Sequence, residues 1–307
     1  MMHDVIVIGG GPAGITAAAT AINRRLNTLI VAEQWGGQTA YSMELEDKET
    51  YDVMTGEELL GRFRQQLDYL DFCRHFDRVA QAEPEADGDR FVVRTQDGDC
   101  FESLALIIAT GAKPQRLEVP GESRLVGRGL SYSVVAHGAL FLGKDVAVVG
   151  SGRRAQLAAI ELSQYAHHIY LLSPDLLPED WPLVPVLRRL ANVTIHEGAA
   201  VQAVTGDQFV DGISVQTVDG GTSDIAVKGV FVKLPRRPNS DLVRDWVHCD
   251  EEGRIEVNVY GATSHPGVFA AGDVTHISEQ VLVHIGEGAK AAVEAYGFLL
   301  ASKARPR

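Results

Sequence analysis

The sequence has little cysteine, and its cysteines are not paired. Its 307 residues include three, Cys73, Cys100 and Cys249, which stand far apart and form neither a C-x-x-C motif nor a metal-ligand pattern. Such spacing favours small buried thiols in a reducing compartment over disulfides or a metal site. We therefore expect a cytoplasmic protein without a metal ion.

Long hydrophobic runs and an excess of positive charge are also missing. No run approaches the roughly 18 apolar residues of a membrane span. No basic segment precedes the first apolar strand, so no signal peptide is expected. Lys and Arg number 28 against 41 Asp and Glu, giving a formal net charge of −13. Neither a membrane nor a nucleic acid is therefore an expected partner.

Glycine, by contrast, is concentrated in motifs. The β-branched run 5–8 predicts a buried parallel strand, and Gly9, Gly11 and Gly14 follow it as G-x-G-x-x-G. The alanine-rich segment 15–22 then predicts a helix. In this order the glycines make a tight turn, admit a pyrophosphate and let helix and strand pack closely. The pyrophosphate would lie at the N-terminus of the helix.

The context makes this weak motif informative. A second apolar strand at 28–32 ends in Glu33, where dinucleotide-binding units place the acid that holds a ribose hydroxyl. The alternative is an ordinary glycine-rich turn in another α/β protein. The order of strand, glycines, helix, strand and acid favours nucleotide binding.

The same pattern restarts in the middle of the chain. A buried strand at 144–149 leads into Gly150, Gly152 and Ala155, a G-x-G-x-x-A turn, and a helix to about residue 165. Further strands are predicted at 169–172, 201–204, 212–218 and 225–233. The chain therefore contains two dinucleotide-binding units.

Segments on both sides of this second unit complete the first. They predict a helix at 56–71, strands at 90–95, 100–104, 104–109 and 267–273, and a closing helix at 286–300. We predict an α/β fold of two Rossmann-like domains of three-layer ββα type, the second inserted into the first. The domains are 1–117 with 244–307 for the first unit and 118–243 for the second.

Further motifs stand along the whole chain. They are Gly36-Gly37-Gln38, Thr55-Gly56, Ala109-Thr110-Gly111, Pro120-Gly121-Glu122, the apolar segment 267–273 that ends in Gly-Asp, Gln280-Val281 and Gly286-Glu287-Gly288. With the two glycine-rich turns, they make the chain resemble the thioredoxin-reductase-like flavoproteins, the low-molecular-weight type of FAD-dependent pyridine nucleotide-disulfide oxidoreductases.

The resemblance implies a homodimer that holds FAD in its first unit. Carried over by position, the residues at the pyrophosphate are Gly9, Gly11, Pro12, Ala13 and Gly14, and the residue at the adenosine ribose is Glu33. The residues along the cofactor are Gly36, Gly37, Gln38, Ala109, Thr110 and Gly111. Gly272 and Asp273 would lie at the ribityl or pyrophosphate end, and Gln280 and Val281 at a helix aimed at the flavin. Relatives have Glu-Asn-Tyr or Glu-Asn-Trp near the flavin, where this chain has Glu46-Asp47-Lys48. A carboxylate at Asp47 would disfavour anionic reduced flavin.

The redox disulfide of the relatives is missing. Their Cys-x-x-Cys-Asp becomes Ser133, Val134, Val135, Ala136 and His137 here. Dithiol–disulfide exchange through this motif is therefore excluded, and with it an ordinary thioredoxin reductase. The imidazole of His137 is a candidate catalytic proton donor near the flavin. The alternative is a polar loop residue.

The nicotinamide site also departs from the relatives. NADPH users follow the second strand with His-Arg-Arg for the 2′-phosphate, and NADH users tend to have Glu there. This chain continues Ser173-Pro174-Asp175, with the acid two residues late. We expect poor binding of NADPH, and NADH as a possible but poor ligand, so that binding of either nicotinamide nucleotide is doubtful.

Arginines lie around the second turn. Arg153 and Arg154 would clamp an unusual phosphate ligand, crowd the pyrophosphate position, or be solvated on a surface helix. Arg236, near the second linker, completes this candidate site for another nucleotide or a second flavin.

Two classes of function follow. The first is an FAD-dependent oxidoreductase that exchanges electrons with an external donor or acceptor, such as a ferredoxin-like protein or a small molecule. The second is a non-catalytic flavin-binding sensor or scaffold with a degenerate nicotinamide domain.

Overall fold

The computed structural model describes residues 2–37, 43–44, 61, 63–65, 67–68, 73–85, 90–276 and 280–303. Packing divides them into two compact units. The first comprises the described residues of Met1–Ala40, Met54–Lys113 and Arg237–Arg307, and the second those of Tyr41–Val53 and Pro114–Arg236. The packing boundaries at 114 and 236 thus fall a few residues before the sequence boundaries at 118 and 243.

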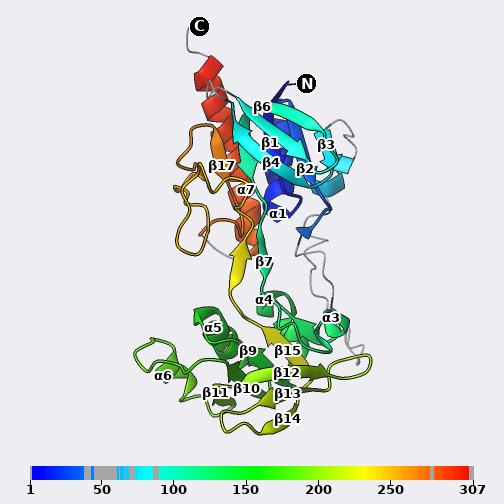
Figure 1. The fold of residues 1–307 in the computed structure, drawn as a ribbon, viewed down its shortest axis with the longest axis vertical. Helices are drawn as coiled ribbons and strands as arrows, with labels where there is room; N and C mark the ends of the chain where they lie inside the picture. Colours follow the sequence, from blue (N-terminus) through cyan, green and yellow to red (C-terminus); the bar gives the residue numbers. More distant parts are fainter. Residues whose placement is uncertain are drawn as a thin grey trace. The chain divides into compact units, whose positions relative to one another are not determined.

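The first unit is built on a seven-stranded sheet with the strand order β3-β2-β1-β6-β5-β4 and β17 added beside β6 (Figure 1). Its elements are β1 (Met2–Ile8), α1 (Pro12–Asn23), β2 (Thr28–Ala32), β3 (Arg74–Phe76), β4 (Val79–Pro84), β5 (Phe91–Thr95), β6 (Cys100–Ile108), β17 (Val268–Ala270) and α7 (Val281–Lys303). The four strands β3, β2, β1 and β6 are parallel to one another, and β17 is parallel to β6.

Strand β6 corrects the sequence analysis, which divided it at Leu104. It is one strand of 9 residues whose two halves have different neighbours on the same side. The first half pairs with β5 in antiparallel register, with Phe91 opposite Ser103. The second half pairs with β17 in parallel register, with Val268 opposite Leu106. The change of partner changes the apolar pattern along the strand, which is why the sequence looked like two strands.

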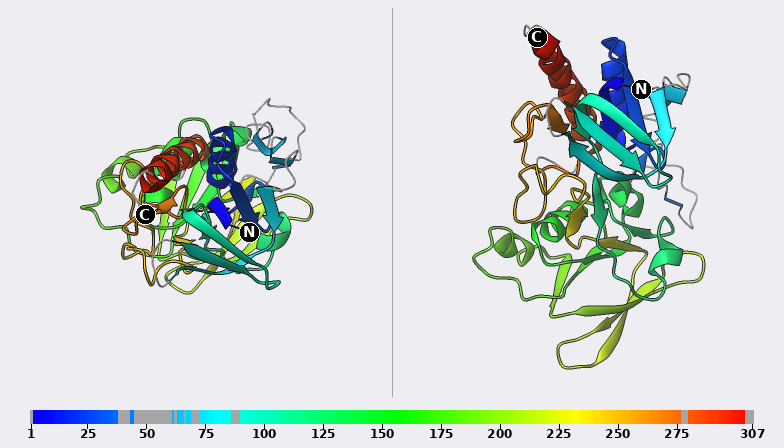
Figure 2. Two further views of the ribbon diagram at one scale, coloured as in Figure 1. Left: turned by 90° about the horizontal axis from the view of Figure 1, so that it is seen from above. Right: turned by 45° about the horizontal axis from the view of Figure 1, so that its top comes forward.

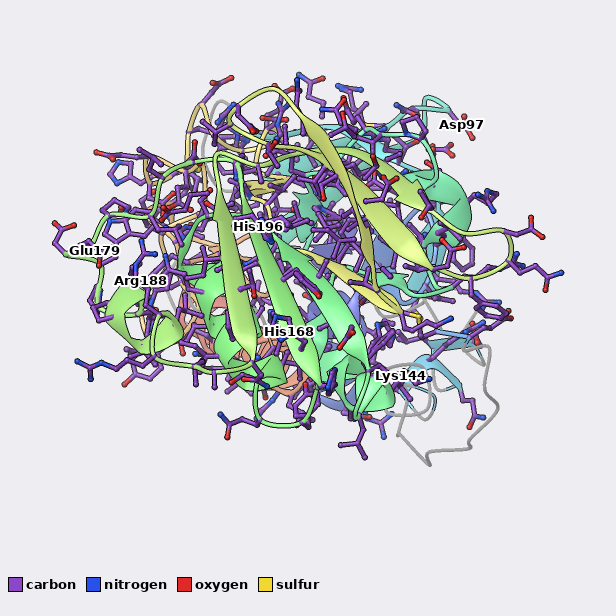
Figure 3. All side chains as sticks on the ribbon, turned by 90° about the horizontal axis from the view of Figure 1, so that it is seen from below. Asp97, Lys144, His168, Glu179, Arg188 and His196 are labelled. Carbon is purple, nitrogen blue, oxygen red and sulfur yellow. The ribbon has the colours of Figure 1, made fainter. Side chains whose placement is uncertain are left out.

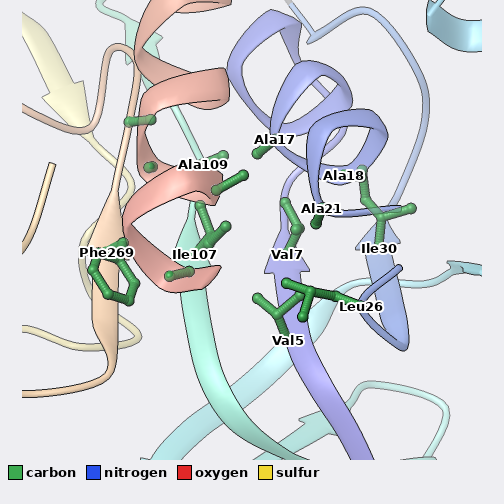
Figure 4. Packing of buried hydrophobic residues seen from close by; sticks show 14 of the residues in the cluster. Val5, Val7, Ala17, Ala18, Ala21, Leu26, Ile30, Ile107, Ala109 and Phe269 are labelled. Atoms are coloured by element: carbon green, nitrogen blue, oxygen red, sulfur yellow. The ribbon is translucent and has the colours of Figure 1, made fainter. Parts of the chain in front are cut away.

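Alternate side chains of β1 supply the two cores of the first unit. Val5 and Val7 pack in one cluster with residues of α1 and α7, and Ile6 and Ile8 pack in another on the opposite face. Figure 4 shows Val5, Val7 and Ile107 in the first cluster beneath the small side chains of α1. Because both faces are covered, β1 is apolar at each of positions 5–8.

Helices α1 and α7 lie side by side on one face of this sheet, as both views in Figure 2 show. Small residues make the close approach possible. A Cβ added at Gly288 of α7 would lie 2.0 Å from the carbonyl oxygen of Ala13 in α1. Thr16 of α1 also donates a hydrogen bond of 3.1 Å from Oγ1 to the carbonyl oxygen of Ile285. The N-terminal part of α7 is therefore fixed beside the N-terminal turn of α1.

The second unit contains a five-stranded parallel sheet with the order β11-β10-β9-β15-β8 and a three-stranded antiparallel sheet with the order β12-β13-β14. Its elements are α3 (Glu122–Leu125), β8 (Leu130–Ser131), α4 (Val134–His137), the 3₁₀ turn η3 (Gly138–Phe141), β9 (Asp145–Val149), α5 (Arg153–Leu162), β10 (His168–Ser173), α6 (Val184–Leu187), β11 (Val193–Glu197), β12 (Ala200–Thr205), β13 (Gly212–Gln216), β14 (Thr222–Ala226) and β15 (Gly229–Val232). Where the chain passes between the units, β7 (Ala112–Pro114) and β16 (Arg236–Pro238) form a two-stranded sheet.

The parallel sheet of the second unit is also covered on both faces. Val146 and Val148 of β9 pack with α5, while Ala147 and Val149 pack toward the antiparallel sheet. This helix–sheet–sheet arrangement confirms the predicted pair of Rossmann-like domains. The predicted strand at 225–233 was wrong, because β14 and β15 occupy this range and belong to different sheets.

Two further sequence expectations involve helices. Within the predicted helix 56–71, the described residues 61, 63–65 and 67–68 are helical, and Leu67 is fully buried. The closing helix is longer than expected and begins at Val281 instead of residue 286. In the described part of the chain, no helix has the length and hydrophobicity needed to cross a membrane.

Candidate functional site

The first glycine-rich turn is closed so tightly that Gly9, Gly10 and Gly14 have no room for a side chain. Gly9 has a φ of 116°, and its N–H donates to the carbonyl oxygen of Val31 at 2.9 Å. A Cβ at Gly9 would lie 2.2 Å from the carbonyl oxygen of Ala109. A Cβ at Gly14 would lie 1.8 Å from the carbonyl oxygen of Gly9. These glycines therefore join strand and helix, as the motif predicts.

Gly11 is different, because the space beside it is open. Among the described residues, a Cβ built there meets no heavy atom within 4 Å. Gly11 is also the N-cap of α1, and no side chain in the described part of the chain caps this helix end. The first N–H groups of a helix have no acceptor within the helix, and its N-terminus carries a partial positive charge. The turn thus fits a diphosphate, which an FAD molecule would place here.

The acid predicted for the ribose lies at the edge of this turn. Glu33 follows β2, the parallel neighbour of β1, and its side chain is exposed. Its Oε1 is 3.6 Å from Nε of Arg78, which is also exposed, so this ion pair contributes little stability. The position at the carboxyl end of β2 fits a ribose acceptor.

The structure also brings the next predicted segment to the turn. Gly36 donates its N–H to the carbonyl oxygen of Gly10 at 2.8 Å, and a Cβ at Gly37 would lie 3.3 Å from Cα of Gly11. Two other predicted cofactor residues, Gln38 and Asp47, lie outside the described residues.

The segment after β6 contacts the turn through Ala109, whose N–H donates to the carbonyl oxygen of Ile8 at 2.8 Å. The next two residues are held by Asn239. The hydroxyl of Thr110 donates to the carbonyl oxygen of Asn239 at 2.7 Å, and the N–H of Asn239 donates to the carbonyl oxygen of Gly111 at 2.9 Å. These bonds fix the loop that leaves β6.

The segment after β17 completes the site. A Cβ at Gly272, which has a φ of 83°, would lie 3.1 Å from the Cβ of Ala13 in α1. Asp273 follows it and is mostly buried. Gln280 is exposed just before α7, which begins at Val281 as the resemblance implied. The predicted residues of β1, β6, β17 and both helices are thus brought together.

The second glycine-rich turn repeats this backbone geometry. Gly150 has a φ of 142°, and its N–H donates to the carbonyl oxygen of Leu172 at 2.9 Å. A Cβ at Gly150 would lie 2.6 Å from the carbonyl oxygen of Lys233. Gly152 caps α5, and a Cβ there meets no heavy atom of the residues that the structure describes within 4 Å. The N-terminus of α5, like that of α1, is therefore suited to a phosphate group.

The side chain of Asp175 lies beside the second glycine-rich turn. Although it comes two residues late in the sequence, its Oδ2 accepts a hydrogen bond of 2.8 Å from the hydroxyl of Ser151, inside the glycine-rich turn. The buried hydroxyl of Ser173 lies 3.0 Å from Ser151 Oγ and donates to the carbonyl oxygen of Asp175 at 2.6 Å. The serine between two glycines was the signal that could have revealed this carboxylate.

The arginines of the second turn have different surroundings. Arg154 is half-buried and donates from Nη1 to the carbonyl oxygen of Leu234 at 2.9 Å. This bond ties α5 to the end of β15. Arg236 is half-buried at the start of β16. Arg153, the first residue of α5, is exposed at the helix end that would face a phosphate.

Helix α4 occupies the position of the relatives' cysteine motif. Ser133 caps it by accepting the N–H of Ala136 at 3.2 Å. His137 has Nδ1 2.8 Å from the hydroxyl of Ser131. Burial, together with the nearby charge of Lys233, lowers the pKa of His137 below its ordinary value. The side chain is therefore neutral near pH 7, and its proposed proton transfer stays a prediction.

A buried acid of the second unit has a structural role instead. Glu122 accepts hydrogen bonds of 2.9 Å from the N–H groups of Leu117 and Glu118 and from the hydroxyl of Tyr132. These three donors satisfy the carboxylate where it is buried. The Pro-Gly-Glu motif of the sequence therefore fixes a loop and places no acid in a site.

Histidines on the parallel sheet of the second unit also have structural contacts. Figure 3 labels His168 on β10 and His196 on β11. The ring centroid of Tyr170 lies 4.8 Å from that of His168 and 6.2 Å from that of His196. Burial lowers the pKa of His196. Among the described residues, no group of three or more His, Cys, Asp or Glu is placed to hold a metal ion.

Comparison with known proteins gives consistent results. The family model of pyridine nucleotide-disulphide oxidoreductases matches residues 3–295. An NADH dehydrogenase of Bacillus subtilis is 35% identical over 97% of this chain and 58% of its own length. One component of the alkyl hydroperoxide reductase of Staphylococcus epidermidis is 34% identical over 97% of this chain and 59% of its own length. The chain thus spans about three fifths of these relatives.

A solved structure is similar over its whole length. Thioredoxin reductase from Streptococcus pyogenes matches with a TM-score of 0.85 and 32% identity, covering 98% of this chain and 99% of that one. The match confirms the resemblance drawn from the motifs and the predicted fold class. At the positions that the resemblance assigns to the cysteine motif, this chain has Ser133 and Ala136.

Proposed function

Because the chain belongs to the pyridine nucleotide-disulphide oxidoreductase family, we propose that it is an FAD-dependent oxidoreductase that accepts electrons from NADH and passes them to an external acceptor. Family membership implies an oxidoreductase that binds FAD and a nicotinamide nucleotide. The choice of NADH and the lack of an internal disulfide are inferred from this chain's own residues.

The residues present fit FAD in the first unit. Gly11 leaves open space at the N-terminus of α1, Glu33 stands at the end of β2, and Gly272 packs against Ala13. When bound, FAD supplies the ability to take a hydride and to release electrons singly or in pairs. The chain's part is to bind and orient the cofactor: α1 directs its positive end at the diphosphate, and α7 begins at Val281 beside it.

The observation that carries the proposal of NADH is the hydrogen bond between Asp175 and Ser151. A carboxylate fixed 2.8 Å from the hydroxyl of the glycine-rich turn is suited to accept hydrogen bonds from a free ribose 2′-hydroxyl. The same charge repels a 2′-phosphate. This supports NADH over NADPH for the second unit.

The acceptor must be outside this segment of chain. A hydride from NADH brings two electrons, and Ser133, Val135 and Ala136 have no group that can be reduced. The electrons therefore leave for a redox protein of ferredoxin type, a disulfide on another segment or chain, or a small molecule. A homodimer, as the resemblance implies, and a cytoplasmic location remain parts of this proposal.

An anaerobic titration tests the proposal. Purified holoprotein receives NADH, NADPH and reduced ferredoxin separately, while the flavin absorbance is followed. We expect one equivalent of NADH to bleach the flavin and NADPH to act far more slowly. Bleaching by NADPH as fast as by NADH would contradict the role of Asp175. Reduction by ferredoxin alone would show that the second unit receives no nicotinamide nucleotide.

The non-catalytic sensor is distinguished by the next step. When an acceptor such as ferricyanide is added in excess, an enzyme oxidises NADH continuously, whereas a non-catalytic protein, whose flavin NADH does not reduce, gives no turnover. If no donor reduces the bound flavin, the sensor or scaffold function replaces our proposal.

A further inference from the structure

Three titratable side chains meet at the edge of the proposed FAD site. Nε2 of His284 lies 3.2 Å from Oδ1 of Asp273, and their side chains are 8% and 13% exposed. Glu287, one turn further along α7, accepts the N–H of Gly272 on Oε2 at 2.9 Å. Two carboxylates and one imidazole thus surround the peptide unit that packs against α1.

The second oxygen of Glu287 has no partner among the described residues. Glu287 is 5% exposed, and its Oε1 is buried without a hydrogen-bond donor in reach. An ionised carboxylate is costly in such a place, and burial raises the pKa of Glu287 above its ordinary value.

The neighbouring elements offer few compensating charges. The groups that act on Glu287 are His284 and Lys290 of α7, which favour its ionised form, and Asp273, which opposes it. From α1, the residues at this contact are Ala13 and Thr16, which do not titrate. The balance of charge therefore depends on His284 and on the protons that the cluster carries.

We propose that His284 is the protonated counter-charge that allows Asp273 and Glu287 to lie beside the FAD diphosphate, so that FAD binding takes up protons at this cluster. The proposal rests on the FAD site proposed above. His284 is a positioning residue: it acts on the cofactor through Asp273, whose carboxylate it holds.

The direction of the effect follows from the charges. A diphosphate brought to the N-terminus of α1 adds negative charge next to Asp273 and Glu287. This favours the protonated forms of both His284 and Glu287, so protons bind together with FAD. Linkage then requires the affinity for FAD to fall as the pH rises, by up to about tenfold per pH unit for each proton taken up.

The test uses the holoprotein at a series of pH values, from about 6 to about 9, where imidazole titrates. Dilution releases FAD, and the rise in flavin fluorescence gives the dissociation constant. Wild-type protein should bind FAD more weakly at each higher pH. His284→Gln should bind FAD more weakly than wild type at low pH and lose most of the pH dependence. His248→Gln, at an exposed histidine of the same unit, is the matched control and should behave as wild type.

A second variant and a direct measurement separate charge from structure. His284→Lys keeps a positive charge over this pH range, so it should retain more affinity at high pH than His284→Gln. Calorimetry of FAD binding to the wild-type chain, in two buffers with different ionisation enthalpies, counts protons even where a variant fails to fold. Zero proton uptake, or an unchanged pH profile in folded His284→Gln, would overturn the inference while leaving the FAD site intact. A chain that binds no FAD at any pH would instead refute the proposed function.

Discussion

The two glycine-rich turns share a backbone and differ in the side chains around it. Gly9 and Gly150 have positive φ values and donate to the neighbouring strand at the same distance of 2.9 Å. Gly11 and Gly152 are both helix caps with open space beside them. The backbone therefore records only that each unit is built to bind a dinucleotide. The side chains around each glycine-rich turn decide which dinucleotide the unit binds.

The third glycine is the first of these differences. At Gly14 a Cβ would lie 1.8 Å from the carbonyl oxygen of Gly9, whereas the second turn accommodates a real methyl group at Ala155, fully buried. Helix α1 is consequently closer to its strand than a side chain would allow. The acids at the strand ends differ too, since Glu33 is exposed and Asp175 is bonded to its own turn.

The largest expected effect is on the stability of the fold, and it comes from substitutions at the third residue of each turn, Gly14 and Ala155. Gly14→Ala forces Gly9 and the start of α1 apart and should destabilise the fold by about 3 kcal/mol, with loss of FAD. Ala155→Gly should cost only about 1 kcal/mol, mainly through helix propensity and the lost methyl group. Chemical denaturation of both variants measures the difference. Equal losses of stability would mean that the two turns have the same packing.

Substitutions at Gly11 and Gly152 should change ligand binding while leaving the stability of the fold unchanged. Gly11→Val places a side chain where a diphosphate would lie, and its Cβ meets no heavy atom of the described residues within 4 Å. We expect at least about a tenfold loss of FAD affinity, since a well-placed hydrogen-bonded anion is displaced. Gly152→Val should retain FAD and lose reduction by NADH. Flavin fluorescence and the anaerobic titration measure the two effects, and a loss of FAD in Gly152→Val would show that the units do not act separately.

The acid of the second turn should set the nucleotide preference. Asp175→Asn removes the charge that favours a ribose hydroxyl and repels a phosphate, so the ratio of kcat/KM for NADH over NADPH should fall by about tenfold. Asp180→Asn, an exposed acid nearby in the sequence, is the control and should keep the wild-type ratio. A ratio unchanged in Asp175→Asn would remove the support for NADH.

The smallest effect concerns His137 and the stability of the fold. Its pKa is lowered in the folded state by burial, so the unfolded chain binds more protons as the pH falls below the ordinary value of about 6.5. The stability from a neutral His137 is complete above that pH and is lost progressively below it. His137→Gln should reduce the fall in urea midpoint between about pH 7 and pH 5 by the equivalent of about 1 kcal/mol or less. His3 and His196, with pKa values lowered by burial, should account for a remaining fall. An unaltered pH profile in His137→Gln would contradict this account.

The sequence predicted the fold well where one physical pattern dominates an element. The strand at 28–32 was placed at its observed bounds because all five of its residues are buried and β-branched or apolar. Strand β6 was divided because its neighbours change halfway, and β14 and β15 were joined because an apolar pattern does not show which sheet a strand enters. Pairing partners distant in the sequence decide both cases.

The candidate site could be predicted at positions where the backbone conformation and its close contacts require glycine. Gly9 and Gly14 have no room for any side chain, so the motif reports their geometry directly. Asp175 and His284 were harder, because each depends on a side chain from another element: Ser151, 24 positions earlier in the chain, and Asp273 in the loop after β17. Spacing within one strand or helix carries no information on such contacts.

Strand β6 pairs with β5 in its first half and with β17 in its second, which has a consequence for the order of folding during synthesis. Its second half is completed only by Val268–Ala270, and the last segment also brings Asp273 and α7. During translation, the continuous segment Pro114–Arg236 leaves the ribosome whole and can fold while the first sheet still lacks a strand. The parallel sheet of the second unit can therefore form before β17 joins the first sheet, and the residues proposed to bind FAD come together only after Asp273 and α7 have been synthesised.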